Sequence, residues 1–502
     1  MYDDDRYDDL PLSNDLTDSP PEEGRRSGCV FLGVTLLLVV SLVGSSILAW
    51  FVLVRREQAT ATPAPLVVST LAPAALLAAL ATPQLIAVAP AAVAPATAQS
   101  PVADGGTAVN RIVIVNPEGQ VETISPSGDD RRVLTREDNS MLFQFPAWSP
   151  DGRRLAVIGS RLTGGGVYVL PDAPGGSDLS ASQVYFSASE TPIYLFWSPD
   201  SAKLAFLANQ ARDGTGLMVI DSAGARESRL LATGAPFYWD WSDDGQQLLI
   251  HTGADRSGGL SLIDVEGAVR AANVATPGAF QAPGIATGDR YWAFAEEADG
   301  LSSLVIVDTQ TGERRNFEPS QSLALSWSPT GEQLAFTNAV SGNHPFWGPL
   351  RVLDASTGQT RLLTRETVLA FFWSPDGRSI AFITLNDSFD DGGTNALAKT
   401  RTLARLASPA QQTTGFLTLS VVDVTTGQGL RLLDFEPTVV FLTQFLPFFD
   451  QYALSHRLWS PDSRSLVLPV REDGDEIILI VSAAGGRPSF LAEGEVAFWS
   501  QR

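Results

Sequence analysis

A short motif that recurs along most of the chain is the feature that most constrains the fold. It reads Trp-Ser-Pro-Asp-Gly or a close variant and is followed by a strand-like run. Copies begin at Trp148, Trp197, Trp241, Ile285, Trp327, Trp373, Trp459 and Trp499; the Ile285 copy lacks the leading Trp and the last is truncated. Their spacing is 40 to 49 residues, apart from 86 between Trp373 and Trp459. Such a period is typical of a propeller blade, so we predict an all-β propeller of four-stranded blades.

Each copy of the motif predicts a turn followed by a strand. Ser, Pro, Asp and Gly suit the four successive positions of a type I turn. The next residues alternate between polar and apolar, as in residues 154–157, which is the pattern of a half-buried strand. The leading indole offers a large flat surface for packing between blades. We therefore expect a structural role for the motif residues Trp148, Trp197, Trp241, Trp327, Trp373, Trp459 and Trp499.

A second pattern, an apolar strand followed by a Gly turn, indicates the number of blades. It begins at residues 112, 167, 217, 260, 304, 350, 419 and 477 and is typical of a hairpin between the third and fourth strands. Seven full units lie between Trp148 and Trp499. The remaining hairpin, Ile112 to Ile124, and the C-terminal strand, Val496 to Trp499, are predicted to join as an eighth blade that closes the ring. Seven blades with loose ends are the alternative.

The first 109 residues differ from the repeat region in composition. Residues 1–29 form an acidic tail, and residues 30–54 are uncharged. A membrane-spanning helix needs about 20 apolar residues, so we predict one transmembrane helix over 30–54. Residues 55–109 are rich in Ala and Pro, which predicts a disordered stalk because repeated Pro disrupts helices and sheets. The propeller is expected to occupy residues 110–502.

The predicted membrane segment is interpreted as an uncleaved signal anchor. Arg25 and Arg26 precede it, and Arg55 and Arg56 follow it, so the flanking charge does not choose an orientation. A single N-terminal span after a short tail usually exports the C-terminal part of the chain. We therefore expect a single-pass protein of the cytoplasmic membrane, with the N-terminus inside and the propeller outside. A cleaved signal peptide is the alternative, although its apolar region is normally shorter.

Charge and composition argue against several kinds of site. The net charge of -22 disfavours nucleic acid, because phosphate binding needs a basic face. Cys29 is the sole cysteine, so the chain forms no internal disulfide. The histidines His251, His344 and His456 have no metal-ligand spacing, and the acidic clusters at 387–391 and 472–476 lack the EF-hand pattern. We expect no metal and no cofactor. His456 precedes Trp459 in a strand expected near the central channel.

The repeat is interrupted most strongly between Trp373 and Trp459, where the blade carries two insertions. The insertion at 386–414 contains a small basic island, and the insertion at 436–452 is apolar. Apolar residues on a loop either cover their own blade or form a contact surface, and both alternatives stay open. The partner-binding hypothesis falls on Phe441, Leu442, Phe445, Leu446, Phe448 and Phe449.

The repeats resemble those of TolB-like propellers over roughly residues 110–502. This resemblance implies the fold and leaves function open, because such propellers serve as scaffolds, receptors and accessory domains. The chain is also similar to prolyl-oligopeptidase relatives, which combine an anchor, an eight-bladed propeller and a C-terminal hydrolase. Here no G-x-S-x-G motif follows a strand, and no histidine follows Trp499.

Together these features predict a membrane-anchored, extracytoplasmic propeller that acts as a non-enzymatic protein-binding or scaffold module. Its partner would be an unidentified protein or envelope component. The alternative is a small-ligand receptor or an enzyme that uses the central channel. A channel plugged by apolar side chains would favour scaffolding, whereas converging acids and His456 would favour the alternative.

Overall fold

The computed structural model describes residues 110–501, except 137–140, 175, 211–213, 254–258, 279–281, 299–300, 321, 340–345 and 387–415. The predicted tail, membrane helix and stalk lie outside the described residues. Within the described part of the chain, no helix has the length and apolarity needed to cross a membrane.

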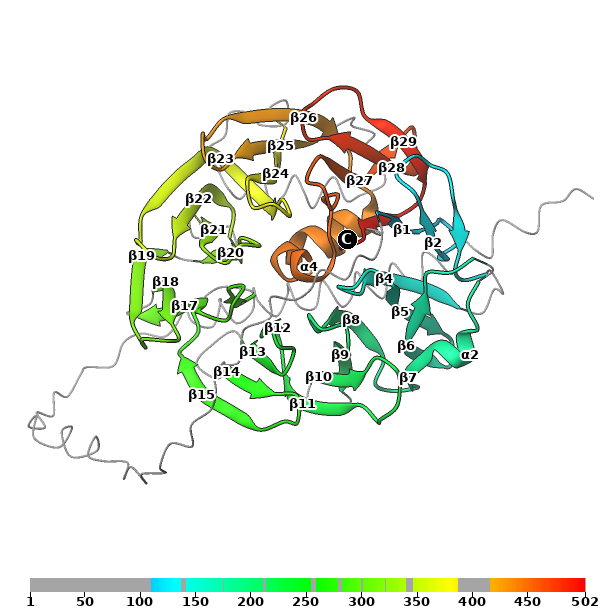
Figure 1. The fold of residues 1–502 in the computed structure, drawn as a ribbon, viewed down its shortest axis with the longest axis horizontal. Helices are drawn as coiled ribbons and strands as arrows, with labels where there is room; N and C mark the ends of the chain where they lie inside the picture. The colour runs from blue at the N-terminus through cyan, green and yellow to red at the C-terminus, as the bar shows by residue number, and fades with distance from the viewer. Residues whose placement is uncertain are drawn as a thin grey trace, which may run out of the picture. The chain divides into compact units, whose positions relative to one another are not determined.

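The described residues form a ring of antiparallel four-stranded blades around a central channel (Figure 1). The first half of the ring contains blade 1, with β30 (Val496–Trp499), β1 (Ile112–Val115), β2 (Val121–Ile124) and β3 (Arg132–Val133); blade 2, with β4 (Leu142–Trp148), β5 (Arg154–Arg161), β6 (Gly164–Pro171) and β7 (Gln183–Ser187); blade 3, with β8 (Pro192–Trp197), β9 (Lys203–Gln210), β10 (Gly214–Asp221) and β11 (Arg229–Gly234); and blade 4, with β12 (Phe237–Trp241), β13 (Gln247–Thr252), β14 (Gly259–Asp264) and β15 (Val269–Ala275). A short helix, α2 (Leu179–Ser182), precedes β7.

The second half of the ring contains one sheet that serves two blades. Its strand list is blade 5, with β16 (Gly284–Ile285), β17 (Tyr291–Ala298), β18 (Leu301–Asp308) and β19 (Arg314–Ser320); blades 6 and 7, with β20 (Leu323–Trp327), β21 (Gln333–Asn338), β22 (Gly348–Asp354), β23 (Thr360–Trp373), β24 (Ser379–Leu385), β25 (Leu417–Asp423) and β26 (Gly429–Phe435); and blade 8, with β27 (Ser465–Glu472), β28 (Asp475–Ser482) and β29 (Ser489–Glu493). The long β23 is the outer strand of blade 6 and then the inner strand of blade 7. In blade 8, Trp459 pairs with Leu466 by an isolated bridge.

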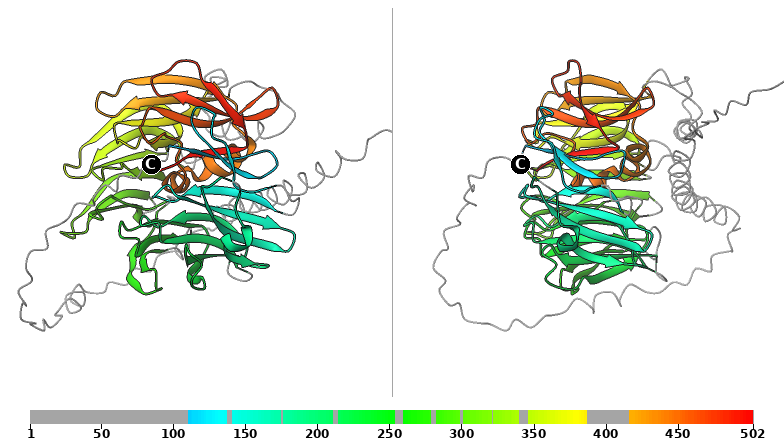
Figure 2. Two further views of the ribbon diagram at one scale, coloured as in Figure 1. Left: turned by 45° about the vertical axis from the view of Figure 1, so that its right-hand side comes forward. Right: turned by 90° about the vertical axis from the view of Figure 1, so that its right-hand side faces the viewer.

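The two ends of the described region close the ring by sharing blade 1. Strand β1 pairs antiparallel with β30, so that Ile112 lies opposite Trp499 and Val115 lies opposite Val496. The turned views of Figure 2 show these C-terminal strands beside the N-terminal ones. The eight blades counted in the described part of the chain, and their closure from both ends, agree with the sequence-based prediction. The third strand of blade 1, β3, was not predicted.

The motif turns have the predicted hydrogen bonds. In the first copy, the Gly152 amide donates to the Ser149 carbonyl at 2.8 Å, and the Ser149 hydroxyl donates to Asp151 Oδ1 at 2.6 Å. The Ser149 hydroxyl also accepts from the Arg154 amide at 3.0 Å, which fixes the start of β5. The side chains of the motif thus satisfy the backbone of their own turn.

The motif Trp residues pack between blades, and several bond to the blade before. Three indoles donate to the residue that precedes the Trp of the previous copy: Trp197 to the Ala147 carbonyl at 3.0 Å, Trp373 to the Ser326 carbonyl at 3.1 Å, and Trp459 to the Phe372 carbonyl at 3.0 Å. All seven are buried except Trp373, which is half-buried. These contacts agree with the structural role expected for the motif Trp residues.

Candidate functional site in the central channel

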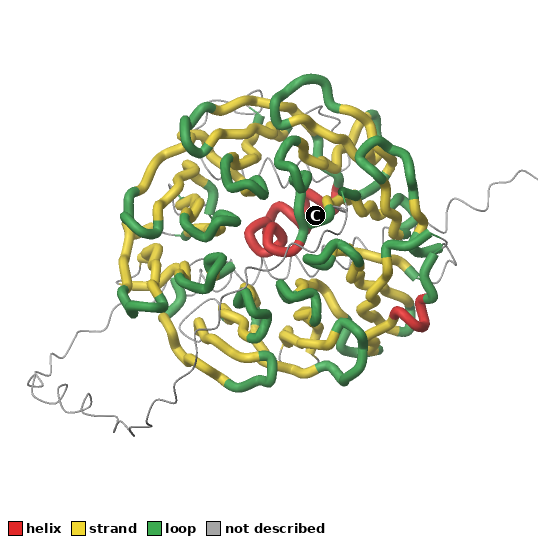
Figure 3. Tube along the Cα trace, viewed as in Figure 1, coloured by secondary structure: helices red, strands yellow, loops and turns green. Residues whose placement is uncertain are grey.

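The apolar insertion after blade 7 lies inside the ring. It forms a π-helical turn, η2 (Phe441–Phe445), a 3-10 turn, η3 (Leu446–Phe448), and a short helix, α4 (Phe449–Ser455). We call residues 441–455 the channel insert. Helix α4 contacts the inner strands β8, β12, β20 and β23, and Figure 3 shows it at the centre of the ring. The insert therefore occupies the central channel.

One side of the channel insert is packed with aromatic rings. The Phe441 and Phe445 rings stack with centroids 4.9 Å apart, Phe445 lies 5.6 Å from Phe498 in β30, and Phe449 lies 5.0 Å from Phe371 in β23. These three insert residues are at most 2% exposed. Their rings join blade 7 to the closing blade through the centre of the ring.

This burial corrects part of the partner-binding hypothesis. Phe441, Phe445, Leu446 and Phe449 are buried against the protein's own core and are out of reach of a partner. Leu442 is half-buried, and Phe448 is 42% exposed. The insertion had to be self-packing or exposed, and self-packing accounts for most of its large side chains because the channel offers them apolar neighbours on every side.

Helix α4 is held in place by a buried polar side chain. Gln451 accepts from the Trp239 amide at 2.8 Å and donates to the Trp239 carbonyl at 3.0 Å. The Tyr194 hydroxyl donates to the Gln451 carbonyl at 3.0 Å. Because these groups are buried, losing one partner would leave the other unsatisfied, so the contacts fix the orientation of α4.

His456 lies where the sequence placed it, beside the channel. Its Nδ1 is 2.6 Å from the Ser455 hydroxyl, which in turn lies 2.7 Å from the Tyr194 hydroxyl. Burial lowers the pKa of His456 to about 3, and the Phe145 backbone opposes this shift. The ring is therefore neutral near pH 7 and too weak a base to accept a proton there. Its contacts indicate a structural role.

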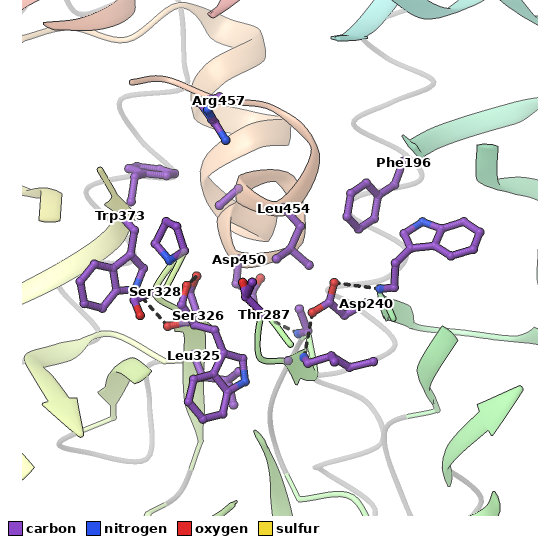
Figure 4. A pocket seen from close by; sticks show the side chains of 18 of the residues that line it. Phe196, Asp240, Thr287, Leu325, Ser326, Ser328, Trp373, Asp450, Leu454 and Arg457 are labelled. Atoms are coloured by element: carbon purple, nitrogen blue, oxygen red, sulfur yellow. Dashed lines mark hydrogen bonds between the residues drawn. The ribbon is translucent and has the colours of Figure 1, made fainter. Parts of the chain in front are cut away.

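A cavity of about 270 Å³ remains on the other side of the channel insert. It lies between α4 and the inner strands of blades 3 to 7, at the end of the channel that carries the motif turns (Figure 4). Its walls combine aromatic rings with a few polar groups. The main contributors are Phe196, Asp240, Trp241, Ile285, Ser326, Trp327, Trp373, Asp450, Ala453, Leu454 and Arg457.

The cavity adjoins the one blade whose motif has lost its leading Trp. Ile285 occupies the place of that Trp, and the neighbouring Gly284 has no side chain. At the other junctions described above, an indole fills this position and bonds to the preceding blade. Here the connection is made differently, because the Ile285 amide donates to Asp240 Oδ2 at 2.8 Å. A smaller side chain and a carboxyl group thus replace an indole beside the cavity.

Two buried carboxyl groups face the cavity from opposite elements. Asp240 comes from β12 and also accepts from the Trp241 amide at 2.9 Å. Asp450 comes from α4 and accepts from the Ala282 amide at 2.9 Å and the Gln451 amide at 3.0 Å. Burial raises the pKa of each carboxyl to about 7, although these amide donors favour the charged form. Both groups can therefore exchange protons near neutral pH.

The described residues contain no group of three potential metal ligands. His251 is buried in blade 4 and stacks on Tyr238 with centroids 5.9 Å apart. His344 and the acidic cluster at 387–391 lie outside the described residues, as does nearly all of the basic insertion. The second cluster, 472–476, forms the hairpin between β27 and β28.

Sequence reasoning missed both carboxyl groups that define the cavity. Asp240 precedes a motif Trp, at a position that carries Ala, Phe, Ser or Leu in other copies. Asp450 lies in an insertion that was interpreted only through its apolar residues. The available signal was the degenerate Ile285 copy, because the loss of a large repeat residue marks the place where packing is incomplete.

Comparisons with known proteins describe the fold. No protein-family model matches the chain, and no curated protein matches its sequence. Among solved structures, a putative TolB from Agrobacterium tumefaciens is 21% identical, with a TM-score of 0.34, and covers 53% of this chain and 95% of its own. An oligogalacturonate lyase in complex with manganese is 15% identical (TM-score 0.44; 74% of this chain, 95% of its own). The dihydro-heme d1 dehydrogenase NirN is 11% identical (TM-score 0.47; 78% and 74%).

These comparisons correct the expectation of a protein without enzymatic activity. Two of the three structures belong to enzymes, a lyase and a dehydrogenase. The expectation rested on missing sequence motifs and on a fold that hosts many functions, so it does not stand. The TolB-like propeller architecture is the part of the resemblance that the solved structures support.

Proposed function

We propose that this chain is a membrane-anchored β-propeller that binds a small ligand in the cavity beside the channel insert. The observation that carries this proposal is the cavity itself: about 270 Å³ stays open in a channel that is otherwise filled. Ligand pockets typically combine apolar and aromatic walls with a few convergent polar groups. Asp240 and Asp450 are such groups here.

The energetics of the two carboxyl groups support a binding role. A buried polar group is costly unless its hydrogen-bonding capacity is used, and a buried charge is more so. Each carboxyl accepts two backbone N–H groups, which leaves lone pairs for a further donor. Replacing either group by an apolar side chain would make a drier channel, so its presence favours a polar ligand.

A pocket-filling variant tests this proposal on the full-length protein in detergent. Ala453 lies in α4 and lines the cavity, so Ala453→Phe should fill it. We expect some members of a metabolite library to raise the thermal unfolding midpoint of the wild type but not of Ala453→Phe. Val269→Phe, on an outer strand where Val269 is 57% exposed, is the matched control and should respond like the wild type. Stabilisation of all three proteins alike would contradict the proposal.

The extracytoplasmic placement is a separate part of the proposal. It is supported by the uncharged run at 30–54 and by the Ala/Pro-rich segment at 55–109. Protease added outside spheroplasts that express the full chain should degrade the propeller and leave the acidic tail protected. Degradation of the propeller only after lysis would reject the placement.

A second candidate is docking of a partner protein on the outer part of the insertion. Val439 and Phe448 are each 42% exposed there, although apolar residues nearby are buried. Phe448→Ser should reduce crosslinking to a specific partner in native membranes without lowering the unfolding midpoint. Unchanged crosslinking would exclude this surface.

A further inference from the structure

We infer that the ligand of the channel cavity is a small neutral polyhydroxyl compound, such as a monosaccharide or a cyclitol. The inference rests on the proposed function and specifies the chemistry of the same site. It follows from the hydrogen-bonding groups around the cavity, from its aromatic walls and from its size.

The cavity walls contain both acceptors and donors that a ligand would have to match. Asp240 and Asp450 supply carboxyl oxygens. Trp241 and Trp327 supply indole N–H groups that are buried and, among the described residues, have no hydrogen-bond partner. Their exposures are 3% and 9%. Buried donors are rarely left unsatisfied, so these two indoles point to a missing acceptor.

A hydroxyl group matches this combination better than a charged group does. It donates and accepts at a single oxygen, so several hydroxyls on one ring can serve the carboxyls and the indoles together. An ammonium group only donates and would leave both indoles unpaired. A carboxylate or phosphate would meet Asp240 and Asp450 without a compensating local cation, because Arg457 already donates to the Gln501 carbonyl and side chain at 3.0 and 2.8 Å.

The shape and volume of the cavity agree with a single small ring. Phe196, Trp241, Trp327 and Trp373 contribute aromatic side chains to its walls, and flat apolar faces suit the C–H faces of a sugar or cyclitol. A volume of about 270 Å³ corresponds to roughly nine water molecules at the liquid value of about 30 Å³ each. This room admits one such ring and not a polymer chain.

The test uses the full-length protein in lipid nanodiscs and five named compounds. D-glucose, D-galactose and myo-inositol are the neutral probes, choline is the cation, and D-galacturonate is the anion. Binding is measured by saturation-transfer NMR and calorimetry. We expect at least one neutral probe to bind and neither charged probe to do so.

Three Trp→Phe variants separate the cavity from general packing. Trp241→Phe and Trp327→Phe keep an aromatic ring but remove the N–H group, so they should weaken the neutral probe roughly three- to tenfold, the value of one hydrogen bond. Trp148→Phe is the matched control, since Trp148 is 2% exposed and its indole also lacks a partner, but it does not line the cavity. It should bind like the wild type.

The possible failures are distinguishable. If none of the three neutral probes binds, or if both cavity Trp variants bind like Trp148→Phe, the inference is overturned. If choline or D-galacturonate binds instead and Ala453→Phe abolishes that binding, the inference is overturned while the proposed function stands. If a bound neutral probe is unaffected by Ala453→Phe, the proposed function fails as well.

Discussion

The junction between blades 7 and 8 and the junction between blades 4 and 5 come from the same repeat but are built differently. At the first, Trp459 is 1% exposed and its indole donates to the Phe372 carbonyl at 3.0 Å. At the second, Ile285 replaces the indole, and the Asp240 carboxyl accepts from the Ile285 amide at 2.8 Å. The first junction is filled, and the second borders a cavity with a titratable wall.

This difference indicates how a repeat protein can acquire a site. Identical blades make a stable ring because every interface is satisfied in the same way. A departure from the repeat at one junction leaves space and introduces polar groups without disturbing the others. The largest departure in length, the insertion after blade 7, fills the channel, whereas the small departure at Ile285 leaves the space beside it.

The largest expected effect comes from breaking the regular junction. Trp459→Ala should lower the free energy of unfolding by about 3–5 kcal/mol, because it removes a buried indole and leaves the Phe372 carbonyl without its donor. Ile285→Ala removes fewer atoms next to an existing cavity and should be near the lower end of the range for its type, about 2 kcal/mol. Urea denaturation of both variants measures the difference. Equal losses would show that the two junctions are packed alike.

The next effect is a pH dependence that arises at the irregular junction. The pKa values of Asp240 and Asp450 are raised to about 7 from an ordinary value of 3.8. Between about pH 4 and 7 the folded state therefore holds more protons than the unfolded state. Its stability falls as pH rises through this window and stays low above it. Glu495, whose pKa burial also raises to about 7, acts in the same direction.

His456 opposes this trend over part of the range. Its pKa is lowered to about 3 from 6.5, so its contribution is present above pH 6.5 and is lost as pH falls toward 3. Three acids outweigh one base, and the free energy of unfolding should be lower at pH 8 than at pH 5.5 by a few kcal/mol, on the order of 1.4 kcal/mol per pKa unit. Asp240→Asn should reduce this difference, and the exposed Glu366→Gln should leave it unchanged. A wild type equally stable at both pH values would rule out the predicted protonation of the buried carboxyls.

The smallest predicted effect concerns the motif turns. In two copies Ser replaces the turn Gly at positive φ: Ser201 at 60° and Ser463 at 62°. Each hydroxyl accepts from the amide of an Asp in the preceding blade, Asp151 and Asp376, at 3.1 Å. Ser201→Ala should cost about 1 kcal/mol because it keeps the strained backbone and loses the bond. Ser201→Gly should be nearly neutral, because relief of strain offsets the lost bond. Equal thermal midpoints for Ala and Gly would contradict this explanation.

Much of the fold follows from local sequence. The turn chemistry around Ser149 and the alternation after it identify strands without knowledge of distant contacts. The closing blade follows from the leftover strands at each end, Ile112 to Ile124 and Val496 to Trp499. These predictions succeed because each depends on neighbours in sequence or on a count of repeats.

The site depends on contacts that sequence does not order. Whether Phe445 and Phe449 turn inward is decided by Phe498 and Phe371, which belong to strands far away in the chain. Asp240 and Asp450 become a pair of cavity walls only once α4 is seated on Trp239 through Gln451. The sequence marked Ile285 as degenerate, but the consequence of a missing indole appears only when its neighbours are in place.

The most direct test of the central claim is to restore the repeat at the irregular junction. Ile285→Trp reinstates the indole that the other copies carry, and Ile285→Val is the control that keeps the small side chain. Calorimetric titration with the neutral compound that the wild type binds should show affinity reduced by roughly tenfold or more in Ile285→Trp and retained in Ile285→Val. Circular dichroism and unfolding midpoints establish that both are folded. A folded Ile285→Trp protein that binds as tightly as the wild type would contradict the claim that the missing Trp creates the site.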